Sequence, residues 1–347
     1  MREIFDVFIN GWTGYANFLW SEIFFKYDYK PWWENYFYWL ILVSLFFLVL
    51  EWIRPWRKDQ PHFRKDFWLD FFYMFFNFFL FSLIIYNAAS SVVVHFFNNT
   101  ILSLFSFDLQ ASNPMQYLPH WSILIIGFIV RDFIQWWIHR LLHRVEFLWN
   151  FHKVHHSIEQ MGFAGHLRYH WMENVVYRFF EYLPLALLGI GLYDFFVIHI
   201  FSLAVGHYNH SNLTVRGQIT GGVLGFLIGL LAISEIPNLS MIVGVGIISA
   251  CTIGCAIIIG PFMKYLFNSP EMHIWHHAHD LPKERRYGVN FALSLSVWDY
   301  LFGTNYIPHD GRDIKLGFPG VEEFPQTFTE QITYGFGITP TEKQQKQ

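Results

Sequence analysis

Charged residues are scarce in this chain: Asp, Glu, Lys and Arg together account for 14% of its 347 residues. A soluble globular protein carries about 25%, so the composition disfavours a soluble fold. Hydrophobic residues reach 53% and aromatic residues 21%. Many Phe and Trp residues stand at the ends of apolar runs, as they do where membrane helices meet water. The chain is therefore predicted to be an all-α, polytopic membrane helical bundle. Its net charge of −4 gives no indication of nucleic-acid binding.

Several signatures are missing as well. The two cysteines, Cys251 and Cys255, lie inside an apolar run, and a single C-x-x-x-C pair is not a metal site. The sequence has no H-E-x-x-H, which removes the signature of a zincin protease. It has no E-x-x-H either, so a carboxylate-bridged di-iron bundle does not fit. Residues 1–35 mix aromatic and polar side chains and are not expected to form a signal peptide.

Apolar runs predict the membrane segments. They cover about residues 36–53, 67–97, 121–138, 175–205, 222–236 and 241–263. The second run is longer than the ~20 residues that one crossing needs, so it is expected to tilt, to kink near Asn87 or to continue along the interface. The fourth run is broken by Pro184, Gly189 and Gly191, which suggests a helical hairpin or a re-entrant pair rather than one crossing. The chain turns polar after about Lys264 and is expected to form a histidine-rich cap that ends in a loose tail at 341–347.

Basic residues predict the orientation of these segments. Five Lys or Arg residues lie between 54 and 65, and residues 66–130 contain none. Because cytosolic loops are enriched in Lys and Arg, the 54–65 loop is expected inside, and the N-terminus and the 98–119 loop outside. If the 175–205 and 222–263 regions are both hairpins, every histidine cluster of the chain faces the cytosol.

Histidine is abundant, and it occurs in short clusters near the ends of the apolar runs. Four clusters read H-R-L-L-H, H-K-V-H-H, H-Y-N-H and H-I-W-H-H, and they contain His139, His143, His152, His155, His156, His207, His210, His273, His276 and His277. Imidazole is a ligand for iron, zinc and copper, and a spacing of four residues places two histidines on one helix face. A lone histidine of this kind is more simply a hydrogen-bonded interfacial residue. Ten on one predicted side are too many for one ion, so the sequence predicts a two-metal site.

Three acidic residues are candidates to support these histidines. Metal-bound imidazoles usually donate their other N–H to a carboxylate or a carbonyl. Asp132 lies two helical turns before His139 on the same face, inside an apolar run where an acid is costly unless it is partnered. Glu173 and Asp299 lie on the predicted cytosolic side. Asp132 and Asp299 are therefore predicted to support catalysis from behind the ligands. The alternative for Asp132 is a pair with Arg131 or a contact with solvent.

The ligand type narrows the chemistry. An all-imidazole two-metal site beside lipid suits iron that activates dioxygen, and such chemistry attacks the unactivated C–H bonds that a membrane offers. Zinc and copper are also compatible with these ligands.

At these residues the chain resembles the fatty acid hydroxylase/sterol desaturase superfamily of integral-membrane di-iron oxygenases. The resemblance covers about residues 115–310. It rests on D-F-I-Q-W-W-I-H-R-L-L-H, W-N-F-H-K-V-H-H-S, L-R-Y-H-W-M-E, H-S-N-L, N-S-P-E-M-H-I-W-H-H-A-H and Y-G-V-N-F-A-L-S-L-S-V-W-D-Y-L-F-G-T. It implies two bound irons, for which zinc can substitute, held by the histidines of the four clusters. His207 has the least defined counterpart among them.

The resemblance also ranks the remaining histidines. His166 and His170 are implied to line the site, and His279 to stand at its rim. No motif includes the others, which are treated as structural: His62, His95, His120, His199 and His309.

The chain departs from the family pattern in one region. About forty residues, roughly 217–260, separate the H-S-N segment from the N-S-P segment. They look like an inserted membrane hairpin, which either forms a wall of the lipid entrance, contacts another protomer or is a neutral appendage. The predicted domains are a membrane region at 1–114, a catalytic domain at 115–310 that contains this hairpin, and a cytosolic C-terminal tail at 311–347.

The predicted function is a membrane-bound oxidoreductase that uses O2 and external electrons to hydroxylate a lipid. The alternatives are a lipid desaturase with the same metal site and, from another class, a membrane metal transporter or sensor. A transporter should carry polar ligands through the bilayer midplane, which the one-sided clusters disfavour. No heme-binding, flavin or iron–sulfur domain is visible, so a separate donor of the cytochrome b5, ferredoxin or flavin type is expected. The lipid and the oligomeric state stay open.

Overall fold

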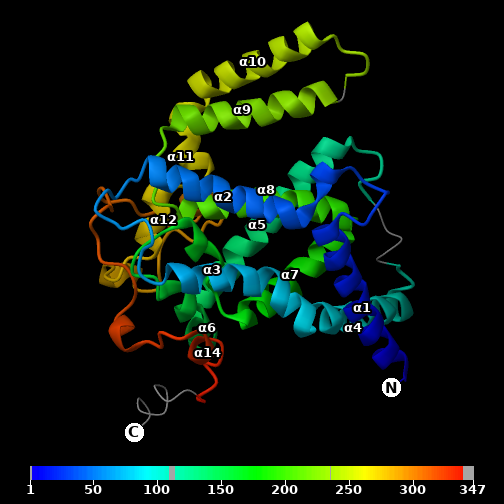
Figure 1. Ribbon diagram of the computed structural model, residues 1–347, viewed down its shortest axis with the longest axis horizontal. Coiled ribbons are helices and arrows are strands. Elements are labelled where there is room, and N and C mark those ends of the chain that lie inside the picture. The colour runs from blue at the N-terminus through cyan, green and yellow to red at the C-terminus, as the bar shows by residue number, and fades with distance from the viewer. Residues whose placement is uncertain (1, 109–113, 235, 339–347) are drawn as a thin grey trace.

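The computed structural model describes residues 2–108, 114–234 and 236–338, and within these ranges the chain forms helices and no strand (Figure 1). The prediction of an all-α fold is confirmed. The longer helices are α1 Arg2–Phe24, α2 Tyr36–Ile53, α3 Phe67–Phe75, α4 Asn87–Phe105, α5 His120–Arg144, α6 Glu146–His156, α7 Trp171–Leu187, α8 Leu192–His210, α9 Gly217–Ser234 and α10 Met241–Ile258. Short helices follow: α11 Met263–Leu266, α12 Pro270–His276, α13 Val297–Leu301 and α14 Phe328–Gln331.

Five helices of the described residues are long and apolar enough to cross a membrane: α2, the continuous helix Phe67–Phe105, α5, α9 and α10. Each coincides with a predicted apolar run. The fourth run forms the predicted hairpin, with α7 and α8 joined at 188–191. These agreements confirm the prediction of a polytopic membrane bundle.

The second run is longer and less regular than predicted. Residues 76–86 form two π-helical turns between α3 and α4, just before the kink expected at Asn87. The helix then continues to Phe105, so residues 98–105, expected as a loop, are helical. Residues 109–113 of that loop lie outside the described residues. Inside the first π turn, Asn77 Nδ2 donates to the carbonyls of Leu167 and Tyr169 at 2.9 Å each, which joins this helix to the segment before α7.

Helix α1 was not predicted from the sequence, and it packs against α4 and α2. The carboxylate of Glu22 is buried at the end of α1 and accepts a hydrogen bond from the backbone N–H of Tyr36 at 2.8 Å. Lys30 lies 2.5 Å from the same carboxylate. This acid therefore satisfies the free N-terminus of α2.

Helix α5 packs against α7 and α8, and α5 and α8 each carry a histidine cluster at one end. The cap covers that end with α6, α12, α13, α14 and the loops between them. Phe318, Val321, Phe324 and Tyr334 of the C-terminal segment pack with residues of α3 and α6. Residues up to 334 are therefore part of the packed cap. The tail at 341–347 lies outside the described residues, and the three domain limits remain predictions.

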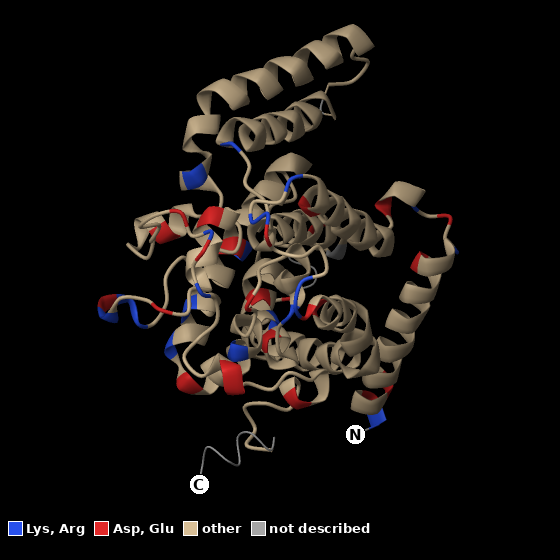
Figure 2. Ribbon diagram, turned by 60° about the vertical axis from the view of Figure 1, so that its left-hand side comes forward, with Lys and Arg blue, Asp and Glu red and all other residues tan. Residues whose placement is uncertain are grey.

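The predicted insert is the α9–α10 hairpin, which projects from the bundle at the top of Figure 1. Glycines of α9 let the two helices pack closely. A Cβ atom on Gly225 would lie 2.2 Å from the carbonyl oxygen of Cys251, and small residues at such crossings are typical of helix pairs in lipid. Figure 2 shows no charged residue along the described part of the hairpin. Residue 235, the one acid of this region, lies outside the described residues.

We expect the two ends of the bundle to face opposite sides of the membrane. In a variant whose two native cysteines are changed to alanine, Ser103→Cys stands at the exposed end of α4, and Glu284→Cys stands on an exposed loop of the cap. A membrane-impermeant thiol reagent added to intact cells should label position 103 and spare position 284 until the cells are opened, because the basic 54–65 loop is predicted to be cytosolic. Equal labelling of both positions in intact cells contradicts this topology.

Candidate metal centre

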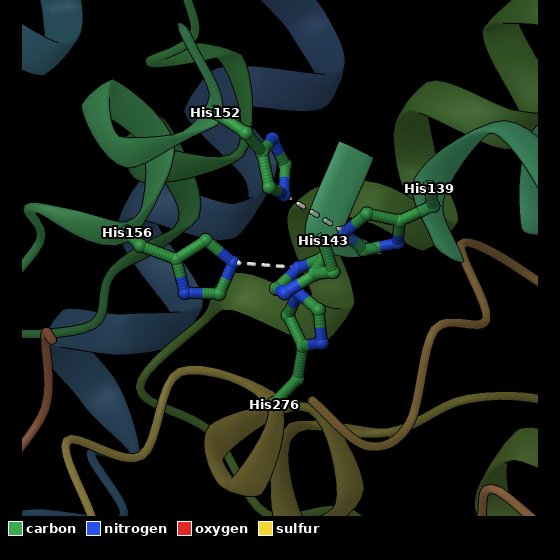
Figure 3. A group of neighbouring side chains, drawn as sticks. All are labelled: His139, His143, His152, His156 and His276. Carbon is green, nitrogen blue, oxygen red and sulfur yellow. Dashed lines mark hydrogen bonds between the residues drawn. The ribbon is translucent and has the colours of Figure 1, made fainter. Parts of the chain in front are cut away.

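Five histidines from three helices converge at the buried end of α5 (Figure 3). We call them the first histidine group, and they are His139 and His143 of α5, His152 and His156 of α6, and His276 of α12. One ring nitrogen of each lies within 4.8 Å of the corresponding atom of every other member. The spacing of four residues on α5 and on α6 places each pair on one helix face, as the sequence predicts.

Four further histidines form a second group beside the first: His155 of α6, His210 of α8, and His273 and His277 at α12. All four are buried. Helix α6 contributes to both groups, since His152 and His156 belong to the first and His155 to the second. The H-x-x-H-H motif of α12 does the same, with His276 in the first group and His273 and His277 in the second.

Hydrogen bonds fix the tautomer of four of these rings, and a fifth ring contacts a carboxyl group. Nδ1 of His139, His155, His210 and His276 lies 2.8–3.0 Å from the carbonyls of Phe291, Arg168, Gly206 and Val289 in that order. Nδ1 of His152 lies 2.8 Å from the carboxylate of Glu173. The four carbonyls carry no proton to give, so Nδ1 donates in those rings and the proton stays there. Burial raises the pKa of Glu173 to about 8, and Nδ1 of His152 donates to this carboxylate when it is ionised. The Nε2 atoms are left with free lone pairs.

The free lone pairs point at one another. Nε2 of His139 and Nε2 of His152 are 3.1 Å apart, as are Nε2 of His155 and Nε2 of His210. Two acceptors cannot form a hydrogen bond, but nitrogens on one metal ion lie about 3.0–3.4 Å apart when each is about 2.1 Å from it. Nε2 of His276 and both ring nitrogens of His277 are buried without a partner among the described residues. The donor sets therefore fit metal ions.

The protonation state agrees with this reading. Burial lowers the pKa of His155 to about 3, and burial together with neighbouring histidines lowers the pKa of His277 well below its usual value. Neutral imidazole is the form that binds metals.

The carboxylates differ in what they contact. Glu173 bonds His152 directly. Asp132 and Asp299, which the sequence placed behind the histidines, contact no imidazole. Asp132 accepts from the backbone N–H groups of Ser294 and Leu295 at 3.0 Å and from Trp298. The alternative pair with Arg131 is also not formed. The face shared with His139 turns Asp132 toward the cap loop rather than toward a ring.

Asp299 holds the same loop from the other side. Its carboxylate accepts the backbone N–H groups of Phe291 and Ala292 at 2.9 Å, together with Trp136 Nε1 and Thr304 Oγ1. The carbonyl of Phe291 in turn fixes His139. Asp299 and Asp132 therefore hold the backbone of residues 291–295, and their support of catalysis remains a prediction.

His207 lies outside both groups. It is three residues before His210 on α8, which turns its ring toward α2, where Nε2 lies 3.1 Å from Ser44 Oγ. Its Nδ1 lies 3.3 Å from Nδ1 of His166. His207 supports the neighbouring ring instead of completing a group.

The remaining histidines differ in whether they line the cavity beside the two groups. His166 lines the cavity beside the second group, whereas His170 caps α7 in a reciprocal bond with Glu173 and touches the carbonyl of Ile332. His279 pairs with Asp280. His199, treated as structural from the sequence, lines the same cavity as His166. A basic residue inside an apolar run was the signal that could have identified it.

A cavity of about 150 Å³ connects the two groups with the interior of the bundle. His139, His152, His155, His210 and His273 form its metal-facing end. A molecule in this cavity would contact both groups at once, so the geometry suits chemistry on a buried organic substrate.

Comparison with known proteins finds one matching family profile and relatives that modify lipids. The fatty acid hydroxylase profile matches residues 124–224 and 218–304, which together cover just over half of the chain. Ornithine lipid hydroxylase OlsE of Rhizobium tropici is 23% identical over 197 residues, 57% of this chain and 46% of that protein. Alkylglycerol monooxygenase of Xenopus tropicalis is 25% identical over 191 residues, 54% of this chain and 30% of that protein. The matches span less than half of either relative, and no solved structure matches the chain.

Metal content tests the two groups separately. We expect His276→Ala and His155→Ala each to lower the metal bound per purified chain from about two ions to about one, because each removes a buried nitrogen from a different group. His207→Ala and the exposed His309→Ala should leave the content unchanged, since neither ring belongs to a group. Elemental analysis measures all four. If His207→Ala loses as much metal as His155→Ala, His207 belongs to the second group and the assignment of that group is wrong.

The hairpin should be dispensable for the metals. No residue of α9 or α10 belongs to either group, and the ends of the insert touch: a Cβ atom on Gly217 would lie 2.2 Å from the carbonyl oxygen of Gly260. Deletion of residues 218–259 can therefore join these two glycines with little distortion. We expect the shortened chain to insert and to retain its metal content. An inserted, folded chain without metal would contradict this boundary.

Proposed function

The chain belongs to the fatty acid hydroxylase family, and from this membership and its two histidine groups we propose that it is a two-metal monooxygenase that hydroxylates a lipid in the membrane. The observation that carries the proposal is the pairing of free Nε2 lone pairs 3.1 Å apart in each group, at the end of one shared cavity. Nine histidines would hold the two ions, the five of the first group and the four of the second.

Iron is the proposed metal, and zinc would compete for the same nitrogens. When bound, two irons supply the redox chemistry that activates O2. Overall, a C–H bond of the lipid, O2, two electrons and two protons give a C–OH bond and water. The chain's own contribution is to hold the rings in one tautomer, to bury them away from water and to present the substrate to both groups through the cavity.

The two electrons come from a separate donor protein in this proposal, of the cytochrome b5, ferredoxin or flavin type. The cap that covers the histidine groups is proposed to face the cytosol, where such a donor reaches it. This placement is supported by the basic 54–65 loop, because cytosolic loops are enriched in Lys and Arg. The cap itself consists of short helices and polar loops.

A metal transporter fits the structure less well. Both histidine groups lie at one end of the bundle, and the cavity beyond them is lined by Arg131 and Arg178. Two guanidinium groups in the path oppose the passage of metal cations. Desaturation would use the same two groups, so the product distinguishes it from hydroxylation.

Product analysis tests the proposal. We expect membranes that contain the chain and a reducing system to form a lipid that carries one additional oxygen atom derived from isotopically labelled O2. The product should be lost in His155→Ala and in His276→Ala, because each leaves one metal group incomplete, and retained in His309→Ala. A product that is two hydrogens lighter and carries no label would identify a desaturase. An unchanged lipid profile with a metal-loaded, reduced enzyme would refute both activities.

A further inference from the structure

A second polar layer lies deeper in the bundle than the histidines. Arg131 Nη1 of α5 donates to Ser202 Oγ of α8 at 3.1 Å, and its Nε lies 3.4 Å from the carboxylate of Glu181 of α7. Arg131 lies eight residues from His139 on α5, and Ser202 lies eight residues from His210 on α8. Glu181 likewise lies eight residues from Glu173 on α7. Because an α helix rises 1.5 Å per residue, the layer lies about 12 Å from the metal end.

The layer carries more positive than negative charge. The guanidinium groups of Arg131 and Arg178 lie 5.4 and 4.5 Å from the centroid of one ring, that of Phe195. The His199 ring lies 5.7 Å from the same centroid. Arg178 forms no ion pair with any residue that the structure describes. Two guanidinium groups and one imidazole thus surround one aromatic ring.

The nearby carboxylate is already engaged. Both oxygens of Glu181 have partners, since Gln135 Nε2 donates to Oε1 at 2.6 Å and Arg131 faces Oε2. His199 Nδ1 is buried and has no partner among the described residues. Glu181 therefore has no oxygen left for Arg178, whose exposed side chain forms no ion pair with any described residue.

The cavity that starts at the histidines reaches this layer. Arg131, Arg178, His199 and Ser202 line it together with the histidines of both groups. A molecule that enters the cavity therefore meets metal ligands at one end and an excess of positive charge at the other.

We propose that the inner end of this cavity binds the anionic group, a carboxylate or a phosphate, of an amphiphilic substrate. The inference rests on the proposed hydroxylase function and extends it to the class of substrate. Guanidinium groups bond two oxygens of such an anion at once, and one negative charge offsets the excess. With the anion held here, the carbon that reaches the metals lies about 12 Å from it. The site of oxidation is then set by its distance from the charged group.

Equilibrium binding tests this subsite without turnover. The purified, metal-loaded full chain is titrated with hexadecanoate, hexadecyl phosphate and hexadecanol, which share one chain and differ in the polar group. We expect at least one of the two anions to bind about tenfold more tightly than the alcohol, since charge-assisted hydrogen bonds are about twice as strong as neutral ones. The anion that binds more tightly than hexadecanol identifies the bound group as a carboxylate or a phosphate.

Arg178→Met is the informative variant because Arg178 has no ion pair whose loss would unfold the bundle. It should weaken the preferred anion about tenfold and leave hexadecanol unchanged, whereas Arg54→Met, an exposed arginine remote from the cavity, should change neither. Equal affinity of the wild type for all three probes, or equal weakening of all three by Arg178→Met, overturns the subsite.

Metal content measured on the same samples separates the two levels of the argument. Two bound ions with no preference for anions would reject the subsite and leave the proposed function standing. A wild-type chain that binds no metal would reject the proposed function, and the anion preference would still be decided by the same titration.

Discussion

The histidine site depends on the hydrogen bonds that Nδ1 makes in five of its imidazoles. Four of the acceptors are backbone carbonyls, to which Nδ1 donates its proton. Such bonds leave Nε2 free, and burial keeps the rings neutral. The carbonyls of Val289 and Phe291 belong to the cap, far along the chain from α5. Asp132 and Asp299 hold this part of the cap by accepting its backbone N–H groups. The site and the cap therefore form one structural unit, although Asp132 and the segment it holds are 162 residues apart in the sequence.

The sequence predicted the features that depend on the spacing of residues along one helix, chiefly which histidines come together. Nine of the ten proposed ligands gather in the two groups, because a separation of three or four residues on a helix decides which rings share a face. The apolar runs predicted the membrane helices for the same kind of reason, since length and composition decide whether a helix can cross a bilayer.

Other features depend on the three-dimensional neighbours and could not be read from spacing. His207 lies in a histidine cluster, yet Ser44 and His166 are what it contacts. Asp132 shares a face with His139, yet the partner it finds is a backbone segment 162 residues away. Helix α1 lacks the apolar composition of a membrane span, and its role appears only when Glu22 meets the start of α2. Each case is settled by a long-range contact that no short pattern contains.

Helix α6 has a consequence for how the ions are taken up. Its eleven residues carry proposed ligands of both groups, His152 and His156 for the first and His155 for the second. A helix this short moves as one body, so an ion bound to either group also fixes the orientation in which α6 offers its remaining ring to the other. The second ion then meets a helix whose ordering cost has been met by the first. By linkage the reverse order gives the same gain, so in the proposed two-metal enzyme each ion would favour the binding of the other.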